Sequence, residues 1–337
     1  MTYGTSADQQ FTDAFPRADE KRYYLARQTA AGAPATTEFQ PLHFLTWTPT
    51  RTEPVNQVNE FGVTGNVDSP DPEFGDPTAA ASETHRLCLN EEFYRLIPLL
   101  GLPTTTEPLP GVFQHIFRTG KSVLPLVTIR DTDSQSTRQS WGLAASSYAL
   151  NVSRAGGVQD VSMSYQPREV EMAAAVPVDP ANIRPVMDRL LVERKAFVVR
   201  VNGVEIGRVL DATLNYSTGI QTENYVGGGD TAHDAIFVGD PTLTVGFSVR
   251  MTSEAQREAF GGKDNPMSIQ LSGVRSDGTL ITFELDRVFG EPVFPTPDDK
   301  LMRLSFSGTA ARSLTDGNRA MMRVRLRNTI NPVDVTP

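Results

Sequence analysis

HRLCLNEEFYRLIPLLG, residues 85–101, reads as the end of a strand followed by a helix. Asn90 stands where a helix N-cap is expected, Glu91 follows in the first turn, and Gly101 comes after the last apolar residue. Carboxylates near a helix N-terminus and a glycine beyond its C-terminus complement the helix dipole and the unpaired backbone groups. The stretch therefore predicts a strand and then a helix that stops at Gly101.

A second stretch, SVRMTSEAQREAFGG at 248–262, has the same arrangement, with Ser253 as N-cap, Glu254 in the first turn and Gly261 at the end. Each helix is followed by four strand-like segments in similar order. These are HIFR, LPLVTIRD, SYALNVS and VQDVSMSY after the first helix, and MSIQLSG, TLITFELD, MRLSFSG and MRVRLRN after the second. The common order predicts an internal duplication.

The duplication predicts how the chain is divided. We expect an N-terminal arm at 1–34, a first β domain at 35–172, a linker at 173–195, a second β domain at 196–331 and a C-terminal tail at 332–337. In the linker, apolar residues recur at helical spacing and Asp179 precedes Pro180 as a cap, which predicts a linker helix over Asp179–Arg194. The arm is polar and is expected to hold at most one short helix, around Arg17–Arg27.

A more obvious recurrence, LNVS at 150–153 and LNYS at 214–217, does not fit this duplication. The offset between the two helices places Leu150 near Ser313 and not near Leu214, so the shared tetrapeptide is interpreted as coincidence. Both copies contain Asn-x-Ser, but such a sequon matters for glycosylation only in a secreted eukaryotic protein.

Strand signals with frequent turns dominate both proposed domains. Asn202-Gly203 and Asp277-Gly278 each lie between two apolar runs, which is a strong hairpin signal. Gly156-Gly157 is expected to join two strands within 141–167, and a Thr-Gly turn two strands within 112–130, whereas 66–84 reads as an insertion. Short strands with turns every ten or so residues are typical of antiparallel sandwiches or barrels.

Composition excludes several classes of protein. The chain has 337 residues and a formal net charge of −9, with 40 acidic and 31 basic residues, so tight binding to nucleic acid is not expected. Cys88 is the only cysteine, which excludes an internal disulfide framework. No apolar run is long enough to cross a membrane, and the N-terminus has no apolar signal core. We expect a soluble protein made in a cytosol.

The richest polar cluster is the loop 219–240, which contains Tyr225, Asp230, His233 and Asp234. An Asp-x-x-His-Asp run could hold a metal only if ligands from another loop converged on it, so a solvated loop is the favoured interpretation. No nucleophile motif or phosphate-binding loop is present, and we expect no enzyme activity, cofactor or metal. Because a long polar loop in a compact domain is often functional, we expect this one to order against an adjacent subunit.

MRVRLRN, residues 322–328, places Met322, Val324 and Leu326 on one face of a strand. Arg323, Arg325 and Arg327 fall on the other face. The simplest interpretation is the solvated face of an edge strand. The sharper one is a contact with acidic groups of another subunit.

Several segments resemble phage tail tube proteins of the siphovirus type. They are YLARQTAAGAPATTEFQPLHFLTWTP and FGVTGNV near the start, the strand-helix block at 85–101, the hairpin YALNVSRAGGVQDVSMSY, and DATLNYSTGIQTENYVGGGD, TLTVGFSVRM, MRLSFSGTAA and MRVRLRNTI in the second half. The resemblance covers about 20–330. It implies a mainly β fold of two tandem β-sandwich domains, each with a flanking α-helix, whose sheets join into an inner β-barrel on oligomerisation.

The resemblance also implies a structural virion protein, the major tail tube subunit. Such a subunit self-assembles into stacked rings around a tape-measure protein, meets tail-tip and tail-terminator proteins, and lets DNA pass through the lumen without specific binding. Two domains per chain imply trimeric, pseudo-hexameric rings. The expected location is the virion tail after synthesis in the host bacterial cytoplasm, with no membrane partner. Alternatives are a distal tail or head–tail joining ring protein, and a carbohydrate- or metal-binding module or enzyme using the 219–240 loop.

Overall fold

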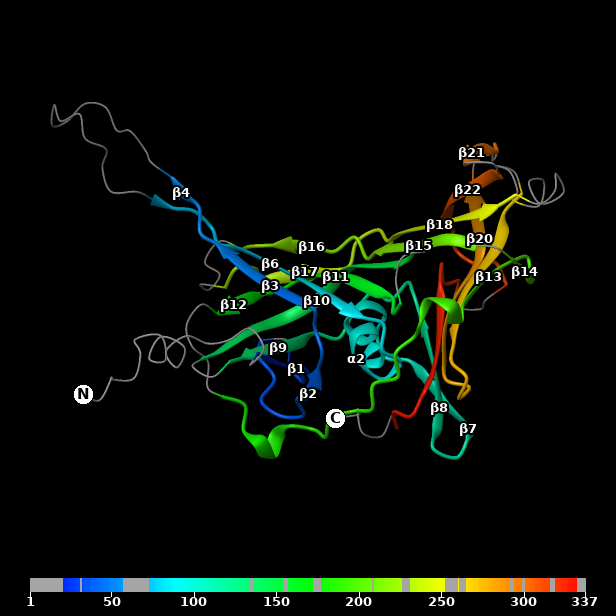
Figure 1. The fold of residues 1–337 in the computed structure, drawn as a ribbon. Helices are drawn as coiled ribbons and strands as arrows, with labels where there is room; N and C mark the ends of the chain where they lie inside the picture. The colour runs from blue at the N-terminus through cyan, green and yellow to red at the C-terminus, as the bar shows by residue number, and fades with distance from the viewer. Residues whose placement is uncertain are drawn as a thin grey trace, which may run out of the picture.

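The computed structural model describes residues 21–30, 32–56, 73–133, 136–153, 157–171, 177–207, 209–225, 231–251, 260, 265–290, 294–298, 301–315 and 319–331. Within these ranges the chain is mainly β, and its ladders are antiparallel, as the sequence predicted (Figure 1). The described helical segments are α2 (Leu89–Leu100) and two 3-10 turns at Pro180–Asn182 and Arg194–Ala196. The second predicted helix, after Ser253, lies outside the described residues apart from Phe260.

The strands before residue 172 form the first half of the molecule. They are β1 (Arg22–Arg27), β2 (Gln40–Leu42), β3 (Thr46–Thr52), β4 (Val55–Asn56), β5 (Glu73–Phe74), β6 (Thr78–Arg86), β7 (Thr104–Leu109), β8 (Val112–Arg118), β9 (Val127–Thr132), β10 (Thr137–Val152), β11 (Asp160–Gln166) and β12 (Glu169–Glu171).

The strands after residue 196 form the second half. They are β13 (Phe197–Val201), β14 (Val204–Ile206), β15 (Val209–Ser217), β16 (Gln221–Glu223), β17 (Ala235–Phe237), β18 (Thr242–Arg250), β19 (Met267–Val274), β20 (Leu280–Gly290), β21 (Thr296–Asp298), β22 (Leu301–Ala310) and β23 (Arg323–Asn328).

One long sheet runs through both halves. Its order is β3–β6–β11–β10–β15–β18–β22, and the end of β20 and β21 follow β22. A second layer has the orders β2–β1–β9–β10–β12 and β14–β13–β19–β20–β23–β8–β7, the latter joining β7 and β8 of the first half to strands of the second. β4–β5 and β16–β17 form two separate hairpins. Figure 1 shows β1, β2 and β9 on one side of β10 and β3, β6 and β11 on the other.

β10 and β20 belong to both layers. The first part of β10 pairs with β9, and its last part pairs with β11 and β15. The change occurs where the β9 register shifts between Ser140 and Leu143, next to Gly142 with φ 65°. Bulges and glycine bends let a strand leave one sheet and enter another, which is how two layers enclose one core.

The same ladders occur in both halves. Each of seven ladders in the first half has a counterpart in the second. The counterparts are β1–β2 and β13–β14, β1–β9 and β13–β19, β9–β10 and β19–β20, β10–β11 and β20–β22, β11–β6 and β22–β18, β6–β3 and β18–β15, and β10–β12 and β20–β23. This order corrects the strand matching made from the sequence, which was shifted by one strand. β9 corresponds to β19, and the β7–β8 hairpin belongs to the first half alone, where its β8 pairs with β23.

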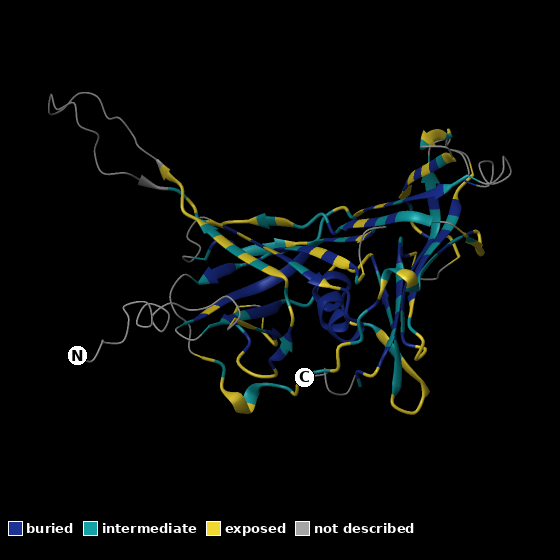
Figure 2. Ribbon diagram, in the orientation of Figure 1, coloured by how far each residue is buried: buried dark blue, intermediate teal, exposed yellow. Residues whose placement is uncertain are grey.

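Helix α2 confirms the prediction from residues 85–101, and it is buried along its whole length (Figure 2). Gly101 ends it with φ 81° and donates its N–H to the Ile97 carbonyl at 2.9 Å. The N-cap is Cys88 and not Asn90. Asn90 lies in the first turn, where its Nδ2 donates to the Asp188 carbonyl at 3.0 Å and so binds the connection between the halves to the helix.

An ionic cluster joins α2 to the sheet. The Arg95 side chain is fully buried; its Nε lies 3.1 Å from Glu83 Oε1, and its other nitrogens reach Glu91 Oε2 at 2.8 Å and the His43 carbonyl at 2.7 Å. Burial disfavours the guanidinium, but the three surrounding carboxylates outweigh that effect and raise the pKa of Arg95. Buried charges persist only when they are paired in this way.

His85, also fully buried, completes the cluster. Its Nε2 lies 2.6 Å from Glu92 Oε1 and its Nδ1 3.2 Å from Glu83 Oε1. Burial and Arg95 lower the pKa of His85, but the two carboxylates outweigh them and raise it. Burial would raise the pKa of Glu83, whereas Arg95 and His85 lower it below its usual range. No local sequence pattern indicates this cluster, because its members come from two elements, α2 and β6.

The predicted helix over Asp179–Arg194 is wrong. Asp179 does cap a turn, accepting the Ala181 N–H at 2.9 Å, but only the 3-10 turn Pro180–Asn182 follows. Beyond it the chain is extended: the Leu190 carbonyl accepts from Leu89 N at 2.9 Å, and Val192 N donates to the Leu87 carbonyl at 3.0 Å. The apolar residues of this segment have helical spacing, but its backbone groups find hydrogen-bond partners on other elements. Pro185 also lacks the N–H that a helix interior requires.

Three smaller predictions are also wrong. The helix expected around Arg17–Arg27 is absent from its described part, because residues 22–27 form β1 between β2 and β9. Part of the expected insertion at 66–84 is β6, a central strand. The two strands of 112–130 do not pair with each other, since β8 lies between β7 and β23 and β9 between β1 and β10.

The three other hairpins are confirmed. β13 and β14 turn at Asn202-Gly203, both with positive φ, and β19 and β20 turn around Gly278 with φ 82°. β10 and β11 pair directly. The tetrapeptides LNVS and LNYS are neighbours, because β10 and β15 place Leu150 opposite Leu214. The two segments meet where the two halves join, but they run antiparallel, so Asn151 lies opposite Thr213 and not opposite Asn215.

Candidate assembly surfaces

The long sheet has two ends, and both are open in the part of the chain that the structure describes. At one end β3 pairs with β6 alone, and its residues alternate between exposed and half-buried. At the other end β21 pairs with β22 alone. An unpaired strand edge offers backbone groups to another chain, so it is a natural assembly surface.

Large apolar side chains gather at the β21 end. Phe294 is 72% exposed, Leu301 58% and Met302 41%. An exposed apolar group of this size is typical of a contact surface. The sequence offered a signal that was not used: prolines inside strand-like runs, such as Pro49 and Pro295, mark edge strands.

Two hairpins extend from the long sheet, and only one of them lies on the body of the chain. The β16–β17 hairpin, which follows β15, packs on the first half, whereas β4–β5, which follows β3, projects away from it (Figure 1). The loop 219–240 was expected to order only against another subunit. Its described residues form hydrogen bonds within the chain, and a contact with another subunit stays a prediction.

His233 and Ala232 form the contact between this loop and the first half. His233 is 6% exposed, its Nε2 lies 2.7 Å from Gln166 Nε2, and its N–H donates to the Arg168 carbonyl at 3.0 Å. The Ala232 N–H donates to Glu169 Oε2 at 2.9 Å. His233 is therefore a positioning group inside the chain and is not an exposed ligand.

The other predicted residues of the loop do not converge on one point. Asp234 accepts the Tyr225 N–H at 2.7 Å, which closes the turn, while the Tyr225 side chain is 54% exposed. Asp230 lies outside the described residues. No group of three His, Cys, Asp or Glu with metal-site geometry occurs among the residues that the structure describes.

The arginine face of β23 is confirmed as an alternating pattern, with Val324 and Leu326 buried. β23 is not an edge strand, however, because it lies between β20 and β8. Glu284 of β20, which the sequence analysis did not single out, pairs with Arg323 and lies 2.9 Å from Arg325.

Arg327 donates to Gln114 Oε1 of β8 at 3.1 Å. Arg118 of β8 lies opposite Arg323, and the registers place Arg200 of β13 and Glu205 of β14 on the same face of this layer.

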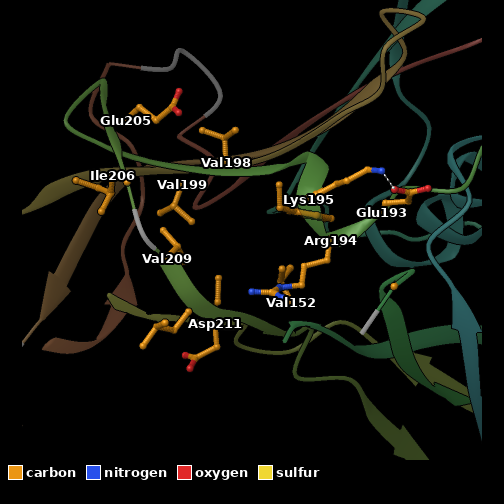
Figure 3. A pocket seen from close by; sticks show the side chains of 15 residues that line it. Val152, Glu193, Arg194, Lys195, Val198, Val199, Glu205, Ile206, Val209 and Asp211 are labelled. Carbon is orange, nitrogen blue, oxygen red and sulfur yellow. Dashed lines mark ion pairs between the residues drawn. The ribbon is translucent and has the colours of Figure 1, made fainter. Parts of the chain in front are cut away.

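A pocket lies where the halves meet, between β13, β15 and the end of β10 (Figure 3). Val152, Val199 and Val209 line it, and the Glu193–Lys195 pair, 2.8 Å apart, is exposed at its rim. Figure 3 shows Lys195 and Glu193 directed at each other and not into the pocket. Arg194, Glu205 and Asp211 also line the pocket, so its walls carry charged as well as apolar groups.

Among the described helices, none combines the length and apolar character needed to cross a membrane. No curated protein matches the chain. A family model described as phage tail tube protein matches residues 20–310, which is most of the sequence and spans both halves and both sheet edges. The chain therefore belongs to the phage tail tube protein family, a family of structural proteins.

Proposed function

We propose that this chain is the major subunit of a tail tube, that it self-assembles into rings, and that the rings stack into the conduit through which DNA leaves the virion. The observation that carries the proposal is the long sheet that crosses from the first half to the second through the β10–β15 ladder. A sheet that already joins two similar units inside one chain can continue from chain to chain through its two open ends.

The recurring ladders support the proposal that the two halves are a duplication, with units near 35–172 and 196–331. A ring of three chains then supplies six sheet units, and its contacts alternate between those within a chain and those between chains. Closed cyclic symmetry of this kind is the usual outcome of heterologous contacts. The β7–β8 hairpin of the first half makes the two units unequal, so the ring's surface should show threefold features.

The proposed partners follow from the family. A tape-measure protein occupies the lumen during assembly, tail-tip and tail-terminator proteins meet the two ends of the tube, and DNA passes without specific binding. The net charge of −9 supports a conduit that does not retain nucleic acid. The proposed location is the tail of the virion, after synthesis in the bacterial host.

We assign the arginine face of Arg323, Arg325 and Arg327 to a contact with acidic groups of another subunit. Glu284 pairs with Arg323 and Arg325, and the Arg327 guanidinium donates to the uncharged amide of Gln114, so these three positive charges exceed the one carboxylate that contacts them. Charge reversal of Arg327 should weaken assembly more at low than at high salt, because exposed charges are screened over about 8–10 Å at physiological ionic strength. Assembly that is unchanged at every salt concentration would remove this assignment.

Electron microscopy of the purified full chain tests the main proposal. Long tubes with three chains per ring are expected, and end-on class averages give the count. Single closed rings would instead indicate a distal tail or head–tail joining protein. Six chains per ring would contradict the duplication, and a protein that stays monomeric under all assembly conditions would contradict the tube function itself.

A further inference from the structure

The junction between the two halves of the chain has a defined register. β10 and β15 pair so that Leu150 lies opposite Leu214 and Asn151 opposite Thr213. Leu150 and Leu214 are buried, whereas Asn151 is exposed. In the order of the long sheet, β10 is thus the last strand of the first unit and β15 is the first strand of the second.

β3 occupies in the first unit the position that β15 has in the second. Alternate core residues of β6, Ala79 and Ala81, match Leu243 and Val245 of β18. Pro49 of β3 lies opposite Ala81, and Leu214 of β15 lies opposite Val245. Pro49 therefore corresponds to Leu214, and Thr48 corresponds to Thr213.

β20 and β21 together occupy the position of β10. Asn151 lies opposite Asp160 in the first unit, and Thr296 lies opposite Arg303 in the second. The β10–β11 ladder shifts register by one residue between Ala145 and Ser147, and the pairs Gly290–Gly308 and Thr296–Arg303 differ by one residue in the same sense. Thr296 therefore corresponds to Asn151, and Pro295 corresponds to Leu150.

The backbone of Pro295 faces the open edge of the sheet. Met251 N donates to the Met302 carbonyl at 2.9 Å, so the backbone N–H and C=O of Met302 point toward β18 and those of the next residue, Arg303, point toward β21. Thr296, which lies opposite Arg303, then faces β22. Because N–H and C=O alternate sides along a strand, Pro295 and Pro297 face outward.

The backbone of Pro49 faces the other open edge by the same reasoning. Leu87 N donates to the Gln159 carbonyl at 2.8 Å. The backbone N–H and C=O groups of the odd-numbered residues of β6 therefore point toward β11, and those of the even-numbered residues point toward β3. Thr48, opposite Ser82, then faces β6 and Pro49 faces outward. Leu214 faces β10 in the equivalent position, as the bond from Thr218 N to the Ser146 carbonyl at 3.0 Å indicates.

We propose that neighbouring copies of this chain join by repeating this internal junction, with β3 of one copy against the open edge of β20–β21 of the next. Thr48 then lies opposite Thr296, and Pro49 lies opposite Pro295. The proposal rests on the tube function proposed above and names its contact surface and register. The exposed side chains of Phe294, Leu301 and Met302 lie at this edge and are covered by the second copy.

The projecting β4–β5 hairpin takes an equivalent place on the next copy. β16–β17 follows β15 and lies on the first unit, where Thr218 donates to the carbonyl of Ala145 in β10 at 3.1 Å. β4–β5 follows β3 and so extends over the second unit of the neighbour, beside Phe289 of β20. This placement gives the hairpin that stands away from its own chain a partner in the ring.

The paired prolines make this junction weaker than its internal counterpart. Leu150 and Leu214 each bring a backbone N–H to the ladder, whereas Pro295 and Pro49 bring none, so two central hydrogen bonds are missing between copies. Prolines on a strand edge also protect it from indiscriminate pairing. The subunit therefore stays unassembled until other contacts of the growing tube add to this one.

Disulfide trapping tests the register. Thr48 and Thr296 are expected to form a pair whose backbones point away from each other, the close-approach geometry that a cross-strand disulfide accepts. Tubes of the full chain with Thr48→Cys and Thr296→Cys should give covalent multimers that stop at three on non-reducing gels. Asn151→Cys with Thr213→Cys should close within one chain, and Thr52→Cys with Thr296→Cys, four residues out of register, should stay monomeric.

A failure of this inference is distinct from a failure of the tube function. Tubes of the Thr48→Cys, Thr296→Cys variant without cross-links, while the internal pair closes, overturn the junction and leave the function intact. Equal cross-linking of the shifted pair also overturns it. A native chain that forms no tubes overturns the function.

Replacing the prolines tests their role and does not depend on added cysteines. Pro49→Ala with Pro295→Ala restores both donors and should lower the critical concentration for assembly about tenfold, because each hydrogen bond contributes about 0.5–1.5 kcal/mol, and 1.4 kcal/mol is a factor of ten. Pro110→Ala, in the exposed β7–β8 turn, is the control and should change nothing. A critical concentration that is unchanged or raised in the double variant overturns the proposed pairing.

Discussion

Replacing Arg95 by methionine should destabilise the folded chain severely. The guanidinium lies between Glu83 and Glu91 at 3.1 and 2.8 Å and is fully buried, so the substitution leaves carboxylates in the core without their cation. Removing one partner of a buried ion pair costs about 3–5 kcal/mol. Since a typical domain is stable by only about 5–15 kcal/mol, the loss is a large part of the total.

A double-mutant cycle separates the ionic contribution from the loss of packing. Glu83→Gln in the Arg95→Met background removes one of the orphaned charges, so the double variant should lose less free energy of unfolding than the two single variants summed. Contacting charged residues typically show coupling of about 0.5–3 kcal/mol. Urea unfolding followed by tryptophan fluorescence suits the measurement, because the Trp47 ring lies 5.9 Å from that of Tyr165, whose hydroxyl donates to Glu83 at 3.0 Å.

Lys195→Met is the matched control. Lys195 pairs with Glu193 at 2.8 Å, but its side chain is 85% exposed, so the unfolding midpoint should not move. If Arg95→Met loses less than about 1 kcal/mol, or if its effect adds to that of Glu83→Gln, the view that this cluster holds α2 to the sheet is wrong.

Three further predictions concern His115, Gly142 and Glu284. Burial lowers the pKa of His115 from 6.5 to about 4, and its Nε2 lies 3.0 Å from Asn328 Oδ1. Unfolding therefore takes up a proton, and the stability of the native chain should fall as the pH drops from 6.5 toward 4. His115→Gln should flatten this pH dependence of the urea midpoint, and an equal slope in the variant would contradict the assignment. Gly142→Ala should cost about 1–3 kcal/mol in unfolding free energy, because φ is 65° and the new Cβ would lie 2.6 Å from the Arg168 side chain; Gly111→Ala, with φ 73° and open space, should cost less. Glu284→Gln should cost about 1 kcal/mol by removing the anion beside the arginines of β23, with a smaller loss in high salt; a loss independent of salt would point to packing instead.

The acid response has a second component, from α2. Burial would raise the pKa of Glu91, but His43 and Arg95 lower it from 4.5 to about 2. Its contribution to stability is therefore present above pH 4.5 and declines as the pH falls toward 2. His85 acts in the opposite direction: because its pKa is raised, its contribution is present below pH 6.5 and declines as the pH rises through the folded value.

The amino-acid sequence by itself determined the features that depend on neighbouring residues. The Asn202-Gly203 turn requires positive φ, the carboxylates and Gly101 bound helix α2, and the alternation in β23 separates arginines from core residues. Each of these signals lies within a few residues, where backbone sterics and side-chain period decide the outcome. They were sufficient for a mainly antiparallel β fold.

Only the tertiary structure decided which segments lie side by side. The extended course of 183–192 depends on hydrogen bonds to Phe39, Leu87 and Leu89, and the pairing of β8 with β23 joins strands about 200 residues apart. The contact between the LNVS and LNYS segments, the five-residue cluster of Arg95 and the position of the outward-facing prolines all depend on such long-range packing. Helical spacing and strand alternation specify which face of a segment is apolar, but a backbone donor can be satisfied by any partner, and the partner is chosen by the packing of the whole core.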